Sequence, residues 1–229
     1  MTIVSIHQPG YLPWLGFFKK IMSCDIFVFL DDVQYEKRGW QNRNRIRTNT
    51  GTVLLTVPVK SKLGMNLNEV KINNQSNWTR KHKKSIEVSY SKTPHFNEYW
   101  NDFKKIYDRD FELLIELNMK IIYYIMEKLN IRTKTIFSSE LHISEKSSNR
   151  ILEICKALNC YEYLSGSQGK SYLNEADFVK NNISVKFQNF HHPVYRQIYE
   201  PFISNMAIID LLFNEGRDSV EILDRAQNF

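Results

Sequence analysis

The sequence is poor in cysteine and holds no long apolar run. Three cysteines occur in 229 residues, Cys24, Cys155 and Cys160, and no two form a Cys-x-x-Cys pair. Such a set excludes a disulfide framework and the usual zinc or thiol redox motifs. The apolar runs are far shorter than a bilayer-spanning helix, and no charged segment precedes an apolar stretch at the N-terminus. We expect free buried thiols, no membrane span and a cytoplasmic location.

Several familiar catalytic motifs are also missing. The sequence contains no Gly-x-Ser-x-Gly, no His-Glu-x-x-His and no Gly-x-Gly-x-x-Gly. These absences disfavour a serine hydrolase of the nucleophile-elbow type, a zincin and a standard dinucleotide dehydrogenase. No internal repeat and no low-complexity segment occurs.

The composition is that of a globular chain with a basic surface. Hydrophobic residues make up 42% and aromatic residues 13% of the sequence, which is enough to bury a sizeable core. The formal net charge is +6. This charge favours an anionic partner such as a nucleotide, a sugar phosphate, RNA or a membrane surface, although many enzymes are equally basic.

The N-terminal 33 residues predict a strand, a turn, a helix and a second strand. An apolar strand ends at His7, a turn broken by proline and glycine follows, and the strand over 26–30 ends at Asp31 and Asp32. Short strands and helices alternate again from residue 134 onward, which is typical of parallel sheets. We expect one α/β domain over 1–229, with a Rossmann-like parallel sheet and helices on both faces. Residues 34–78 form a small antiparallel β insertion and residues 79–131 a helical subdomain in this prediction.

Polar residues at the predicted strand ends are the first candidates for a site. Ligands of open parallel sheets bind beyond the carboxyl ends of the strands, where His7, Asp31 and Asp32 fall. His7 could act as an acid or bind a phosphate, or it could cap the turn. Either aspartate could bind a cation or a hydroxyl group, or it could pair with a downstream arginine. Gln8 and an exposed-looking pair, Tyr11 and Trp14, belong to the same turn.

The segment 34–47 is dense in planar hydrogen-bonding and stacking groups. Arginine matches phosphates and carboxylates with two donors, and tryptophan or tyrosine offers a face for a base or sugar ring. Alternation along a strand could instead turn the arginines to solvent. The candidate ligand-binding residues are Gln34, Tyr35, Arg38, Trp40, Asn42 and Arg43.

Three later segments add candidates. Lys81 lies in a basic helix start, and Ser165 opens a Gly/Ser loop after a strand that could cradle a phosphate but lacks Walker spacing. His192 and Tyr195 follow the last strand. Adjacent histidines without a further ligand at helix spacing make a poor zinc site, so no metal ligands are assigned.

Together these segments resemble the WbqC-like protein family. The resemblance rests on residues 7–16 (His-Gln-Pro-Gly-Tyr-Leu-Pro-Trp-Leu-Gly), 30–35, 38–43, 163–166 and 192–195. It implies a protein of bacterial O-antigen or other surface-polysaccharide biosynthesis, loosely labelled as a glycine or aminoacyl transferase. A more distant likeness, of the first strand and turn, is to nucleotidyl transferases with a His-x-Gly-His motif, although only one histidine is present here.

The first-choice function is a transferase that attaches a small acyl or aminoacyl group to a nucleotide-linked amino sugar. His7, Asp31, Asp32 and His192 are its candidate catalytic residues, and Asp32 or His192 could supply the base needed near the sugar amine. The alternatives are a metal-dependent glycosyl or nucleotidyl transferase and an RNA-binding module without catalysis. The cofactor stays open: ATP, a nucleotide sugar and Mg²⁺ are each compatible. Nucleic acid is disfavoured as a partner, apart from a tRNA carrying an aminoacyl donor.

Overall fold

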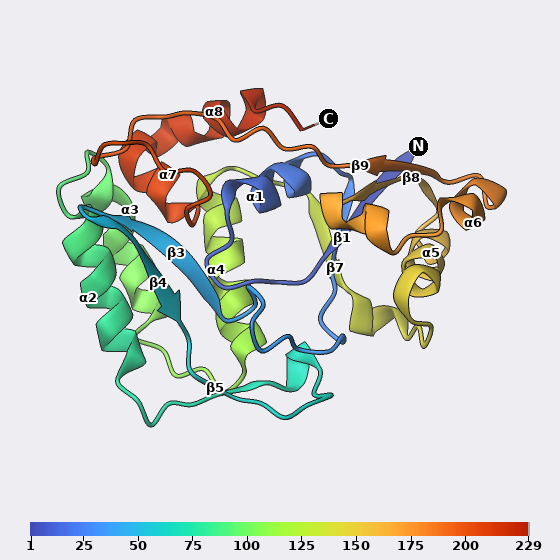
Figure 1. Ribbon diagram of the computed structural model, residues 1–229, viewed down its shortest axis with the longest axis horizontal. Helices are drawn as coiled ribbons and strands as arrows, with labels where there is room; N and C mark the ends of the chain where they lie inside the picture. The colour runs from blue at the N-terminus through green and yellow to red at the C-terminus, as the bar shows by residue number, and fades with distance from the viewer. Residues whose placement is uncertain (229) are drawn as a thin grey trace.

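Five parallel strands form the main sheet of the computed structural model, which describes residues 1–228 (Figure 1). They are β1 (Thr2–His7), β2 (Ile26–Phe29), β7 (Lys134–Phe137), β8 (Cys160–Ser165) and β9 (Ser184–Phe187). Their spatial order is β7-β2-β1-β8-β9, and every neighbouring pair is parallel. The chain builds the sheet from β1 through β2 to β7 and then restarts on the other side of β1 with β8. This order confirms the Rossmann-like α/β fold predicted from the sequence.

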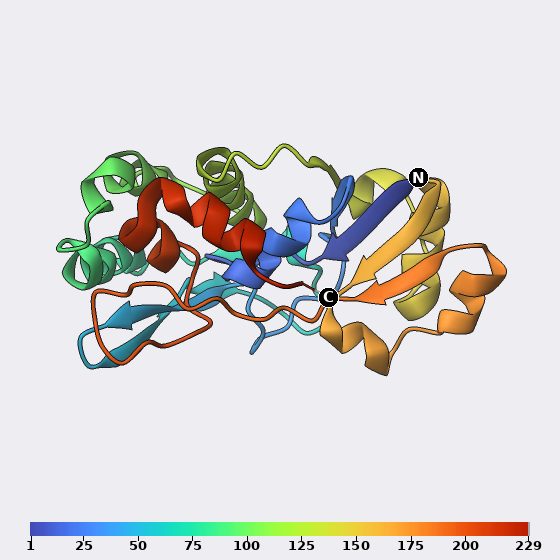
Figure 2. The same cartoon turned by 90° about the horizontal axis from the view of Figure 1, so that it is seen from above.

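Side chains of the two central strands alternate between two hydrophobic cores, as the period of a strand requires. Val4 and Val28 belong to a core with α5 (Ser147–Ala157) and α6 (Glu175–Lys180), whereas Phe27 and Phe29 face α1 (Leu15–Met22) and α4 (Leu114–Lys128). Helices therefore cover both faces. Figure 2 shows β1, β8 and β9 side by side.

The segment between β2 and β7 carries the expected antiparallel pairs and helices. The pairs are β3 (Arg43–Thr48) with β4 (Gly51–Thr56) and β5 (Val59–Lys60) with β6 (Lys71–Ile72). The helices are α2 (Trp78–Tyr90), α3 (Phe96–Phe103) and α4. The last helices are α7 (Ile209–Glu215) and α8 (Ser219–Arg225), and Gly216, the C-cap of α7, adopts a positive φ of +57°. None of the helices formed by residues 1–228 is long and apolar enough to cross a bilayer.

Short 3-10 helices connect several of these elements. They are η1 (Leu67–Glu69), η2 (Lys104–Ile106), η3 (Ser138–Leu141), η4 (Ser167–Ser171) and η5 (Gly216–Asp218). Two of them, η3 and η4, follow directly on the strands β7 and β8. They therefore lie at the carboxyl edge of the sheet, where the predicted site residues also fall.

The start of α1 depends on a close contact between Trp14 and Gly16. A Cβ atom on Gly16 would come within 2.5 Å of the Trp14 indole ring. We expect Gly16→Ala to displace the indole and to lower the free energy of unfolding by about 1–3 kcal/mol, the usual cost of overpacking. Urea unfolding and near-ultraviolet circular dichroism measure both effects. An unchanged tryptophan signal with unchanged stability would contradict this packing.

Candidate functional site

The ends of β1 and β8 lie side by side where the direction of sheet growth reverses. Ser5 pairs with Leu164 in the parallel register, so His7 and Ser165, the last residues of the two strands, end at one edge. Ligands of doubly wound sheets bind in this place, the topological switch point. Three elements meet here: the turn after β1, the helix α1 and the Gly/Ser loop after β8.

His7 ends β1 at this edge, with part of its side chain open to solvent and its ring packed against protein. Its Nδ1 donates to the backbone oxygen of Gln8 at 2.9 Å, so Nε2 carries the lone pair. Desolvation by the surrounding protein and the ammonium of Lys20 lower the pKa of His7 to about 4. The ring edge packs on Phe17 of α1, which orients the imidazole. At neutral pH, His7 can therefore accept a proton at Nε2.

Lys20 brings a buried ammonium group to the same edge. Its side chain is 1% exposed, and Nζ donates to the backbone oxygen of Ile6 in β1 at 2.9 Å. Burial lowers the pKa of this ammonium to about 7. The sequence analysis did not select Lys20, although its spacing from Phe17 and Cys24 on a helix places all three on one face.

Ser165, predicted to bind a ligand, is buried. Its hydroxyl donates to the backbone oxygen of Gly166 at 3.2 Å, and a Cβ on Gly169 would lie 2.0 Å from Ser165 Oγ. Ser165 therefore fixes the turn into η4 and leaves the contact with a ligand to the following residues. Ser167 and Gln168 are exposed there.

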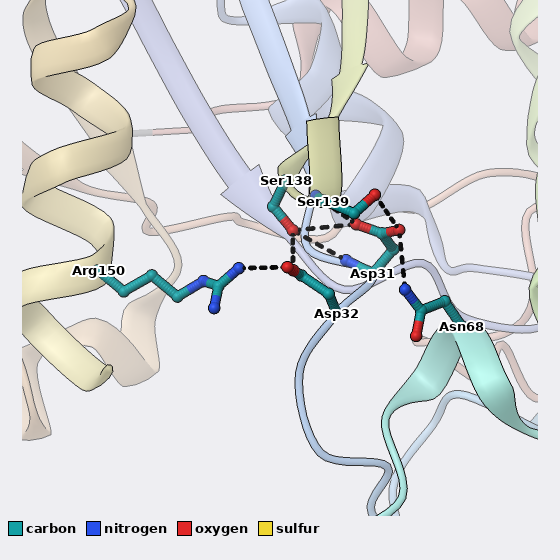
Figure 3. Close-up of polar contacts among 6 residues, drawn as sticks. All are labelled: Asp31, Asp32, Asn68, Ser138, Ser139 and Arg150. Carbon is teal, nitrogen blue, oxygen red and sulfur yellow. Dashed lines mark hydrogen bonds and ion pairs between the residues drawn. The ribbon is translucent and has the colours of Figure 1, made fainter. Parts of the chain in front are cut away.

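Asp31 is held by donors from two other segments (Figure 3). Its Oδ1 accepts from the backbone nitrogen of Ser139 at 3.0 Å, and its Oδ2 accepts from the Ser139 hydroxyl at 2.7 Å and from Asn68 at 3.4 Å. The Ser138 hydroxyl lies 3.0 Å from Asp31 Oδ1, and the side chain is 5% exposed. The carboxylate thus ties the end of β2 to η3 and to η1.

Asp32 points the other way and pairs with Arg150 of α5 (Figure 3). Arg150 Nη2 lies 2.6 Å from Asp32 Oδ2, and the Ser138 hydroxyl contacts Asp32 Oδ1. Both carboxylates therefore contact the Ser138 hydroxyl, but Asp32 alone of the two pairs with Arg150. This geometry matches the alternative in which an aspartate of the pair binds a downstream arginine.

The acids form no cluster with other metal-binding groups. Among residues 1–228, no group of three or more histidine, cysteine, aspartate or glutamate side chains is placed to hold a metal ion.

The turn after His7 packs against the start of the 41–47 segment. Gln41 Nε2 donates to Gln8 Oε1, and Tyr11 N donates to the backbone oxygen of Trp40 at 3.3 Å. Asn118 of α4 bridges the two segments, because its Nδ2 donates to the backbone oxygens of Gln41 at 2.7 Å and of Pro9 at 3.2 Å. The structure thus brings these two sequence-predicted regions together.

This junction also contains buried polar atoms without a partner. Among the described residues, no hydrogen-bond donor reaches Gln41 Oε1, Asn42 Oδ1 or Asn118 Oδ1. Each of these side chains is at most 4% exposed. Buried acceptors are normally satisfied, so three at one junction mark a place that a donor-rich molecule or water would complete.

The arginines of this segment have different environments. Arg43 donates to the backbone oxygen of Lys37, and Arg47 is 1% exposed with backbone oxygens as its acceptors. Arg45 is exposed and lies over the ring of Trp40, which is itself 55% exposed. The alternation therefore does not produce one solvated arginine face.

The other predicted binding residues are spread over several surroundings. Tyr11 was expected at the surface but is fully buried, with its hydroxyl 2.6 Å from Tyr107 and 2.8 Å from His82, because the turn folds its ring into the core. Trp14 is half-buried and packs edge-on against Phe190. Tyr35 is buried, whereas the three exposed ones are Gln34, Arg38 and Lys81.

His192 and Tyr195 belong to the segment between β9 and α7. His192 Nδ1 donates to the backbone oxygen of Pro193 at 2.8 Å, its ring stacks on Tyr195, and burial lowers its pKa. Tyr195 donates to Asp210 Oδ2 at 2.7 Å in a buried network that includes Tyr90. No contact joins this network to His7 within the described part of the chain.

Two surface cavities lie away from these residues. One, of about 350 Å³, is lined by the end of α4 and the following loop, including Tyr123 and Arg132. The other, of about 290 Å³, lies between the start of α2 and Asp110. Neither is lined by a residue that the sequence pattern singled out as a candidate.

Sequence reasoning missed five residues of this region. Ser138 and Ser139 follow β7 directly, so their position at a strand end was a usable signal, and Lys20 interrupts an apolar helix face. Nothing local in the sequence marked Asn68 or Arg150, because each is defined by a partner more than 35 residues away.

Comparison with known proteins agrees with the resemblance seen in the motifs. A sequence profile described as the WbqC-like protein family matches residues 8–222. The chain is 33% identical over 227 residues to uncharacterized protein Rv1507c of Mycobacterium tuberculosis (strain ATCC 25618 / H37Rv), covering 97% of this chain and 98% of that protein. No solved structure matches the chain. The profile match over nearly the whole sequence, including the turn at the end of β1, shows that this chain belongs to the WbqC-like protein family.

Proposed function

We propose that this protein is a transferase of surface-polysaccharide biosynthesis that attaches a small acyl or aminoacyl group to a nucleotide-linked amino sugar. The observation that carries the proposal is the unprotonated imidazole of His7 at the β1/β8 switch point of a Rossmann-like sheet, with the amino group of Lys20 beside it. Nucleotides bind at this point in such sheets. The family resemblance supplies the polysaccharide context.

In the proposed reaction, the sugar amine attacks the carbonyl carbon of an activated acyl or aminoacyl ester or thioester. A carbon–nitrogen amide bond forms, and the bond from the acyl carbon to the donor oxygen or sulfur breaks. His7 Nε2 takes the proton that the amine loses and returns it to the leaving oxygen or sulfur. A negatively charged substrate beside His7 would oppose the desolvation and the Lys20 charge, and would thereby raise the basicity of the imidazole.

The unpartnered amide oxygens near the His7 turn support a sugar as the ligand. Hydroxyl and amino groups of a sugar are donors, and Gln41, Asn42 and Asn118 each hold a buried acceptor without a donor. Asp31 and Asp32 act in this proposal as the framework of the adjacent strand ends, because both are engaged by protein donors.

The metal-dependent alternative requires a cation on the Leu30-Asp31-Asp32 strand end. It predicts that a chelator abolishes nucleotide binding, whereas acyl transfer without a metal is indifferent to chelation. The RNA-binding alternative requires Trp40 as a stacking face. It predicts binding that falls steeply with salt and is lost in Trp40→Ala.

His7→Gln tests the catalytic assignment. We expect the rate of acyl transfer to fall by about 10²- to 10⁴-fold, the usual contribution of a general base. The assay is mass spectrometry of UDP- and dTDP-amino sugars incubated with acyl or aminoacyl donors, after a thermal-shift screen that also includes ATP and Mg²⁺.

His191→Gln is the matched control for this substitution. His191 is exposed, its imidazole is hydrogen-bonded to Asn189, and its backbone bond to Gln227 is kept by the substitution, so the change should leave the rate unchanged. A His7→Gln variant that keeps its rate within a factor of about three would reject the role of His7.

A further inference from the structure

Lys20 is a buried cation without a carboxylate partner. An ammonium has three donors, and Nζ uses one of them, on Ile6 O, in the described part of the chain. The titratable groups beside it are His7 at the end of β1, which is neutral at pH 7, and Cys24, which lies just after α1. Burial raises the pKa of the Cys24 thiol to about 12, so it too carries no charge. A buried charge without compensation is costly.

The β8 loop places a residue without a side chain, Gly166, next to this ammonium. A Cβ atom built on Gly166 would meet Lys20 Nζ at 3.8 Å and, apart from its chain neighbours, no other heavy atom within 4 Å. Gly166 is the first residue after β8, and Ile6, the acceptor for Lys20, lies next to the last residue of β1. Lys20 Nζ thus lies between the two strand ends, beside a position that has no side chain.

We propose that Lys20 is the cation that receives the diphosphate of the nucleotide-linked substrate at the β1/β8 switch point, and that Gly166 leaves the room for it. The identity of the anion rests on the proposed function, whereas the binding of a diphosphate beside Lys20 can be tested without any transfer reaction. The two unused N–H donors of Lys20 would bond to phosphate oxygens, and the anion would supply the compensating charge. His7 would then lie beside the bound nucleotide, next to the reacting groups.

Lys20→Met and Gly166→Ala test this assignment by two different routes. Methionine keeps the length and apolar stem of Lys20 but removes the charge. Alanine at 166 keeps the charge and fills the space, and the φ of −68° at this residue is allowed for alanine. Lys19→Met is the matched control, because Lys19 is the neighbouring lysine of α1 but bonds to Asp224 near α8.

The measurement is isothermal titration of inorganic pyrophosphate and of UDP into the wild-type protein and the three variants. Loss of a charge-assisted hydrogen bond weakens binding by about tenfold to a hundredfold. We expect that loss in Lys20→Met and in Gly166→Ala and an unchanged affinity in Lys19→Met. Inorganic phosphate, which offers a single phosphoryl group, should bind more weakly than pyrophosphate.

Two results would overturn the assignment. One is a wild-type protein that binds neither pyrophosphate nor UDP. The other is an equal loss in Lys19→Met, which would show a general effect of charge. If Lys20→Met does not fold, the affinity of Gly166→Ala for pyrophosphate tests the assignment alone. Unchanged affinity in that variant would reject it.

The failure of this inference and that of the proposed function are distinguishable. Diphosphate binding that depends on Lys20, without acylation of any nucleotide sugar, would retain the inference and reject the transferase. Acylation with unchanged kinetics in Lys20→Met would retain the transferase and reject the inference about Lys20.

Discussion

Lys20→Met is expected to be more stable than the natural chain at pH 6, by about 3 kcal/mol in the free energy of unfolding. Burial lowers the pKa of Lys20 from 10.5 to about 7, so the folded state resists its protonation. This lowering of the pKa means that the protonated lysine costs the folded state roughly 4–5 kcal/mol of stability at low pH. The lost hydrogen bond to Ile6 O offsets about 1 kcal/mol of the gain.

The sign of the pH dependence makes this prediction specific. Below pH 7 the lysine is protonated in both states, and the full penalty is present. Between pH 7 and 10.5 the unfolded chain binds the proton and the folded chain does not, so the stability of the natural chain rises with pH. We expect it to approach that of Lys20→Met by about 1.4 kcal/mol for each pH unit between 7 and 9.

Urea unfolding at pH 6, 7, 8 and 9 measures this convergence. His7, with a pKa of about 4 when folded and 6.5 when unfolded, changes its proton count chiefly below pH 7, so the slope between pH 7 and 9 reports mainly on Lys20. Lys19→Met should run parallel to the natural chain. Parallel curves for Lys20→Met and the natural chain would show that Lys20 titrates as an ordinary surface lysine.

Asp31→Ala should cost about 3–5 kcal/mol of stability, the loss found when one partner of a buried charged network is removed. The substitution leaves the Ser139 backbone nitrogen, the Ser139 hydroxyl and the Asn68 amide without their acceptor at a site that is 5% exposed. It also releases η3 from the end of β2 (Figure 3). Urea unfolding measures the loss.

Asp25→Ala is the matched control for Asp31→Ala. Asp25 is exposed and accepts one hydrogen bond, from Ile3 N at 2.8 Å, so its loss should cost about 1 kcal/mol or less. If both substitutions cost the same, the hydrogen bonds around Asp31 do not support the sheet edge. A catalytic role for Asp31 would then be the better explanation of its position.

The alternation of strands and helices was readable because it depends on local periodicity. The apolar run over 26–30 and the stripe over 114–129 specify a buried strand and an amphipathic helix whatever surrounds them. The positions of His7, Asp31 and Asp32 at strand ends followed from the same pattern. The use of those side chains did not, because the donors to Asp31 come from residues 68 and 138–139.

Tyr11 shows the limit of reading exposure from composition. A turn with two prolines and two glycines resembles a surface loop, yet the Tyr11 hydroxyl finds partners on α2 and at Tyr107, and the ring enters the core. Burial of an aromatic residue is favourable when its hydroxyl is satisfied, and those partners lie more than 70 residues away along the chain.

The sequence by itself determined the parallel α/β sheet, its short antiparallel pairs and the membership of the WbqC-like protein family. Periodicity and short motifs are local properties of the chain, so they can be recognised without knowing which residues are in contact in the fold. Only the tertiary structure decided that Asp31 and Asp32 are held by serine, asparagine and arginine donors, and that an uncompensated lysine lies beside His7. The charge state and the free donors of a side chain depend on neighbours that the fold, and not the chain order, brings together.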